Sequence, residues 1–222
     1  MTAMHFDYLR DPDTIYRESF AAISSAADLG ALPNDMHAVA LRVAHACGDV
    51  AAIGDLRWSD GAALAGQRAL AAGAPILTDS RMVADGIIRR ALPADTPVLC
   101  TLGLGSVRGL AARGRTTRSA AAVELWVPWL EGAVVAVGNA PTALFRLLEG
   151  LAAGWPRPAL IVGMPVGYVG AREVKDALID ADATPYIALT GRRGGSAVAA
   201  ATINALANAL SNALAIEQGS AP

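Results

Sequence analysis

The sequence has 222 residues, of which 54% are hydrophobic and 17% are charged, and its mean hydropathy is +0.39. This composition excludes a mainly disordered chain and supplies enough apolar surface for one sizeable core. The net charge of −2 excludes the strongly basic surface that binds nucleic-acid phosphates, so we expect no nucleic-acid partner.

The first third of the chain is predicted to be helical. Helical patterns cover 12–27, 35–47 and 60–72, and the second helix is expected to start from an Asn34 cap and to end at Gly48. The chain opens without a basic segment followed by an apolar one, so we expect no secretory signal. A reducing cytoplasm is the expected compartment.

Short apolar runs that alternate with helical patterns follow this region, which is typical of βαβ units. The predicted strands are Pro75–Thr78, Val98–Leu102, Ala133–Val137, Ala159–Val162 and Tyr186–Leu189, and helices are expected over 82–90 after Asp79 or Ser80, over 120–130 after Thr117, and over 142–152 after Asn139. The pattern predicts an α/β fold with three layers, α/β/α, a mainly parallel sheet and a helical N-terminal third. We expect a single domain over 1–222.

The longest apolar stretch, 197–214, approaches the length of a membrane span. It contains Asn204, Asn208 and Asn212 at intervals of four residues, which predicts a polar stripe along one side of a helix. We therefore expect an amphipathic helix outside the membrane, suited to a subunit interface, followed by a disordered tail over 214–222.

Three glycine-rich loops, 138–142, 163–170 and 190–196, follow the last three predicted strands. Ligands of parallel sheets bind beyond the carboxyl ends of the strands, and each following helix start offers free N–H groups to an anion. Several anionic groups could be bound in this way; the alternative is that the glycines only satisfy turn geometry. No loop matches a nucleotide-binding motif.

Among the three histidines, His45 is the candidate acid, whereas His5 and His37 are interpreted as solvated or structural. His45 lies in the last turn of its predicted helix, where the helix dipole favours the imidazolium, while Arg42 on the same flank opposes it. A structural histidine is the alternative. Cys47 and Cys100 have no metal-type spacing, so we expect no metal site, and Cys47 is interpreted as a small hydrophobic residue.

Seven segments in order resemble the precorrin-8X methylmutases of cobalamin biosynthesis, and the resemblance covers nearly the whole chain. They are 7–20 (DYLRDPDTIYRESF), 42–48 (RVAHACG), 73–79 (GAPILTD), 117–121 (TRSAA), 138–145 (GNAPTALF), 163–170 (GMPVGYVG) and 191–197 (GRRGGSA). The stretches 49–67 and 103–114 and the tail after Ala213 depart from the family pattern.

The resemblance implies an isomerase without a cofactor that moves a methyl group from C-11 to C-12 of precorrin-8X and gives hydrogenobyrinic acid. The family's acid corresponds to His45, which would protonate the ring C nitrogen and ease a 1,5-sigmatropic shift. By motif match Ser19, Arg42, Thr117 and Arg118 would bind the substrate, which carries seven carboxylates around an apolar macrocycle. The family is homodimeric, with sites near the subunit interface.

Three alternatives stay open from the sequence. The same reaction could act on the cobalt-bearing precursor, because the metal would arrive within the substrate. The chain could instead be a non-catalytic tetrapyrrole-binding protein, or a nucleotide enzyme of the Rossmann type.

Overall fold

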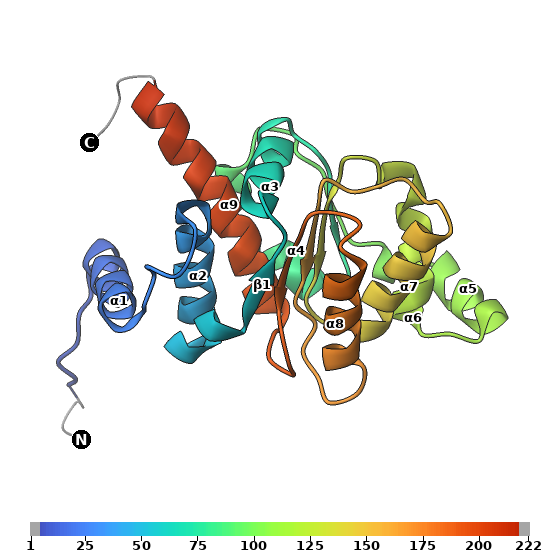
Figure 1. Cartoon of the computed structure of the whole chain (residues 1–222), viewed down its shortest axis with the longest axis horizontal. Helices are drawn as coiled ribbons and strands as arrows, with labels where there is room; N and C mark the ends of the chain where they lie inside the picture. Colours follow the sequence, from blue (N-terminus) through green and yellow to red (C-terminus); the bar gives the residue numbers. More distant parts are fainter. Residues whose placement is uncertain (1–4, 218–222) are drawn as a thin grey trace.

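The computed structural model describes residues 5–217 and has the predicted three layers (Figure 1). A six-stranded sheet has the strand order β1-β6-β5-β4-β2-β3. The strands are β1 (Leu56–Trp58), β2 (Ile76–Thr78), β3 (Val98–Leu99), β4 (Val134–Val137), β5 (Leu160–Gly163) and β6 (Tyr186–Leu189). All neighbouring strands from β3 to β6 are parallel, and only β1 runs antiparallel, against β6. The α/β class and the mainly parallel sheet are confirmed.

Helices cover both faces of this sheet. They are α1 (Pro12–Ala26), α2 (Asn34–Cys47), α3 (Ala62–Ala71), α4 (Arg81–Gly86), α5 (Ser106–Gly114), α6 (Arg118–Val123), α7 (Pro141–Ala152), α8 (Ala171–Ala181) and α9 (Ser196–Glu217), with short 3₁₀ turns η1 (Val50–Asp55), η2 (Arg89–Ala91), η3 (Thr101–Gly103) and η4 (Glu124–Trp129). One hydrophobic core lies between the sheet and α2, α3, α4 and α9, and a second lies between the sheet and α7, α8 and η4. α1 and α2 lie at one end of the molecule and α5 and α6 at the other (Figure 1).

Several predicted boundaries differ from the structure for local reasons. The cap of α2 is Pro33, and Asn34 is already helical without a side-chain cap bond, so the predicted Asn34 cap is wrong. The helix predicted over 120–130 ends at Val123 and continues as a 3₁₀ turn that contains Pro128, because proline removes a helical hydrogen bond. The edge strand β1 was not predicted.

Most of the α9 side chains whose burial is described, those of 196–209, are buried, which corrects the predicted polar stripe. Asn204 is only 6% exposed. Its Oδ1 accepts a hydrogen bond from the N–H of Ile88 (2.8 Å), and its Nδ2 donates to the carbonyl of Gly86 (2.9 Å). Asn208 is half-buried, and the side chain of Asn212 lies outside the described residues. Asn204 therefore forms hydrogen bonds with backbone groups at the end of α4 instead of facing solvent.

The expected tail over 214–222 overlaps the end of this helix. Residues 214–217 continue α9, and 218–222 lie outside the described part of the chain. Across residues 5–217, no helix combines the length and apolar character that a bilayer crossing requires.

The three glycine-rich loops meet at the carboxyl edge of the sheet. The N–H of Gly195 donates to the carbonyl of Met164 (2.9 Å), and the N–H of Gly167 donates to the carbonyl of Arg192 (3.2 Å). A Cβ atom at Gly138 would lie 2.8 Å from Cα of Ser196, so this close approach of two backbones requires glycine. The loops thus form one connected surface.

Lys175, the only lysine in the chain, is buried on α8 and contacts the backbone of one of these loops. Its Nζ donates to the carbonyl of Arg193 (2.7 Å). Burial lowers the pKa of Lys175 to about 8, against the opposing influence of Asp176 and Asp55.

This pKa predicts a pH-dependent stability. Between about pH 8 and 10.5 the unfolded chain binds a proton at Lys175 that the folded chain has released, so the free energy of unfolding rises with pH by up to about 3 kcal/mol from this group. Urea denaturation of the native chain and of Lys175→Met across this range measures the effect, because the variant lacks it. Equal pH slopes for the two proteins would contradict the prediction.

Candidate active site

His45 lies in the last turn of α2 with its imidazole exposed, and two residues of α1 hold it. The Nδ1 atom is 2.9 Å from the hydroxyl of Ser19, and the Phe20 ring stacks on the imidazole with centroids 5.1 Å apart. Within residues 5–217, no hydrogen-bond partner occupies Nε2 of His45. The ring is therefore fixed on one edge and open to a ligand on the other.

Arg42, one turn earlier on α2, completes the same cluster. Its guanidinium donates to the hydroxyl of Tyr16 (2.8 Å) and lies 5.2 Å from the ring centroids of both Tyr16 and Phe20. It also lines a cavity of about 630 Å³ together with Arg90. The structure thus brings together three of the predicted residues, Ser19, Arg42 and His45.

Sequence reasoning missed Tyr16 and Phe20 as parts of this site. Their rings stack with centroids 4.4 Å apart. The signal was present, because Tyr16, Ser19 and Phe20 are spaced i, i+3, i+4 and so share one face of a helix.

We expect Ser19→Ala to lower the turnover rate about fivefold, since one hydrogen bond that orients the imidazole contributes roughly 1 kcal/mol. Initial-rate measurements test this, with Ser24→Ala as the matched control, because Ser24 is an exposed serine on the same helix. Equal rates for the two variants would show that Ser19 does not orient His45.

Thr117 and Arg118 lie apart from this cluster, at the α5–α6 end of the molecule (Figure 1). The Thr117 hydroxyl caps α6 by accepting a hydrogen bond from the N–H of Ala120 (3.1 Å). The same hydroxyl lies 2.8 Å from the hydroxyl of Thr142. Arg118 is exposed and forms no ion pair with the described residues. One chain therefore holds the predicted site residues as two separate groups.

Asp79, at the end of β2, accepts hydrogen bonds from backbone N–H groups of the loop that precedes α7. Its buried carboxylate accepts from the N–H groups of Gly138 (3.0 Å), Asn139 (2.9 Å) and Ala140 (2.6 Å). Burial raises the pKa of Asp79 while these three bonds oppose the rise. The protein's own carboxylate thus occupies the N–H groups of the loop before α7, and these groups are not open to a ligand.

The surroundings of His37 and Cys47 fit the structural roles expected for these two residues. His37 is half-buried, and its Nε2 lies 3.1 Å from the carbonyl oxygen of Leu32. Burial raises the pKa of the Cys47 thiol, which disfavours the nucleophilic thiolate.

Comparison with known proteins adds an independent observation to this geometry. The sequence profile described as precorrin-8X methylmutase matches residues 14–209. The chain belongs to the precorrin-8X methylmutase family. Its members are isomerases, so the chain is identified as an isomerase.

The relatives include a precorrin-8X methylmutase of Pseudomonas aeruginosa, which is 56% identical over 90% of this chain and 97% of the relative. A cobalt-precorrin-8 methylmutase of Salmonella typhimurium is 37% identical over 90% of this chain and 96% of the relative. A solved structure of a precorrin-8X methyl mutase from Thermus thermophilus has a TM-score of 0.82 and 37% identity, and covers 95% of this chain and 98% of that one.

Proposed function

We propose that this chain acts on precorrin-8X in cobalamin biosynthesis and moves a methyl group from C-11 to C-12 to give hydrogenobyrinic acid. The observation that carries the proposal is the His45 imidazole, bonded at Nδ1 to Ser19 and open at Nε2. The higher identity to the precorrin-8X enzyme than to the cobalt-precorrin-8 enzyme supports the cobalt-free substrate.

In this mechanism the Nε2–H of His45 donates its proton to the ring C nitrogen of the substrate. Protonation draws electron density out of the conjugated ring and eases the 1,5-shift of the methyl group. The Ser19 hydroxyl accepts from Nδ1–H, which keeps the proton on Nδ1 when Nε2 has given its own away. The proton returns to Nε2 as the product forms, so one positioned acid suffices.

The substrate's carboxylates require cationic partners around the acid. Arg42 meets this requirement beside His45, and its stacking on two rings leaves its charge available. Thr117 and Arg118 would bind a further carboxylate, with the Thr117 hydroxyl and the exposed guanidinium as donors. No dissociable cofactor or metal enters this mechanism.

We further propose that the chain is a homodimer in which a second copy brings Thr117 and Arg118 toward His45. This arrangement is supported by α1, none of whose residues is buried, and by the exposed apolar side chains of Phe6, Tyr8 and Ile15. Light scattering at micromolar concentration should give about twice 22.7 kDa. A monomer would contradict the dimer. We propose the cytoplasm as the compartment.

An absorbance time course with precorrin-8X tests the function directly. The native chain should convert the substrate spectrum into that of hydrogenobyrinic acid. Turnover of only the cobalt-bearing substrate would assign the reaction to the cobalt route. A shifted ligand spectrum without turnover of either substrate would support a binding protein instead.

A further inference from the structure

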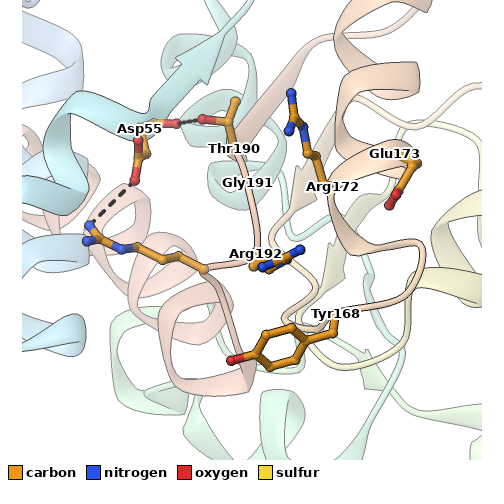
Figure 2. Close-up of a pocket in the computed structure, with 8 residues that line it drawn as sticks. Asp55, Tyr168, Arg172, Glu173, Thr190, Gly191 and Arg192 are labelled. Carbon is orange, nitrogen blue, oxygen red and sulfur yellow. Dashed lines mark hydrogen bonds and ion pairs between the residues drawn. The ribbon is translucent and has the colours of Figure 1, made fainter.

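Two neighbouring cavities lie at the carboxyl edge of the sheet, next to the end of α2. One has a volume of about 530 Å³ and is lined by Ala46 and Cys47, which directly follow His45 in the sequence. The other, of about 560 Å³, extends toward α8 (Figure 2). Both are lined by Tyr168, Arg192 and Arg193. These three side chains thus border a continuous surface that reaches the last turn of α2.

The two adjacent arginines have different roles in this surface. The Arg193 guanidinium is paired with Asp49 (3.2 Å) and Asp55 (3.4 Å). Its carbonyl oxygen accepts the hydrogen bond from Lys175. Arg193 is therefore held at both its side chain and its backbone, and two carboxylates already balance its charge.

The Arg192 side chain is positioned by an aromatic ring, and no carboxylate of the described residues balances its charge. Its guanidinium lies 5.1 Å from the centroid of the Tyr168 ring, and Figure 2 shows it directed away from Asp55. Of the carboxylates in residues 5–217, none lies within ion-pair distance of it. Stacking on an aromatic ring restricts a guanidinium while its N–H groups stay available to an acceptor.

The surroundings of this arginine suit an amphipathic ligand. Tyr168 and Val169 are 84% and 89% exposed, and Val166 is also exposed, so apolar side chains face solvent there. Ala197 and Val198 add small apolar side chains to the lining of the cavity beside α2. A flat apolar ligand could rest on these side chains while a carboxylate at its rim reaches Arg192.

We propose that Arg192, stacked on Tyr168, binds a peripheral carboxylate of the macrocyclic substrate, and that Arg193 only holds the loop in place. The inference rests on the proposed function and adds a specific contact to it. A planar guanidinium with two parallel N–H donors matches the geometry of a carboxylate.

The test compares Arg192→Met with Arg172→Met. Arg172 lines the same 560 Å³ cavity but is paired with Asp176 on its own helix (3.4 Å), which makes it a control of equal charge change. We expect Arg192→Met to raise the Kd for hydrogenobyrinic acid and the KM for precorrin-8X by about 10- to 100-fold, with kcat within about twofold of the native value. Arg172→Met should leave all three within about twofold.

Tyr168 supplies a second readout of the stack. Tyr168→Phe, which keeps the ring, should bind product as the native chain does, whereas Tyr168→Ala should weaken binding about threefold to tenfold through loss of the cation–π contact. If the native chain converts precorrin-8X and Arg192→Met binds the product as tightly as the native chain does, the Arg192 contact is overturned while the proposed function stands. Failure of the native chain to bind or convert precorrin-8X would overturn the proposed function and the inference together.

Discussion

Replacing His45 with alanine is expected to lower the turnover of precorrin-8X by about 10²- to 10⁴-fold, the usual contribution of a positioned general acid. The imidazole is exposed and its Nε2 is open, so its loss removes the proposed proton donor without opening the core. Product binding should survive, because the arginines proposed to bind the carboxylates of the ligand stay in place. Stopped-flow rates together with equilibrium titration of hydrogenobyrinic acid separate the two effects.

His5→Ala is the matched control for this experiment, since His5 is an exposed histidine outside the cluster. It should turn over substrate at the native rate. A His45→Ala variant that keeps the native rate would remove His45 from the reaction. A tetrapyrrole carrier would bind ligand equally with either variant and turn over none.

Replacing Asp79 with asparagine is expected to lower the free energy of unfolding by about 2–4 kcal/mol, because an amide presents an N–H group where a backbone N–H needs an acceptor. In the native chain the Asp79 carboxylate accepts hydrogen bonds from three buried or half-buried N–H groups of the 138–140 backbone, and Asp79 is 3% exposed. Urea denaturation measures the change.

Asp85→Asn provides the control for Asp79→Asn, since it removes the same charge from an exposed position on α4. Its stability should stay within about 0.5 kcal/mol of the native value. If the two variants unfolded at the same urea concentration, the backbone of the 138–140 loop would not depend on Asp79.

Local sequence signals predicted most elements of the fold. Apolar runs located β2, β4, β5 and β6 to within one residue at each end, because these strands are buried on both faces and read as continuous hydrophobic stretches. The edge strand β1 has an exposed Arg57 at its centre and only three residues, so its pattern resembles a loop. Its pairing with β6 arises from contacts across more than 120 residues.

Two of the motifs that carry predicted site residues lie together in the structure. The histidine block and the Y-R-E-S-F block are local motifs, and the structure places them against each other through the Ser19–His45 contact. No local pattern could indicate that Asp79 would fill the N–H groups of the 138–140 loop. Asp79 follows β2 and the 138–140 loop follows β4. These strands are neighbours in the sheet, but Asp79 and Asn139 are 60 positions apart in the sequence.

By itself, the sequence determined the fold class, the family and the candidate acid, because periodicity, helix ends and ordered motifs are properties of short segments. The tertiary structure decided which polar groups are already satisfied and which are open. It paired Asn204 with the end of α4 and Arg193 with Asp49 and Asp55, and it left Arg192 on the Tyr168 ring. Hydrogen bonds and ion pairs act only over a few ångströms, so their partners are known only when distant segments have been brought together.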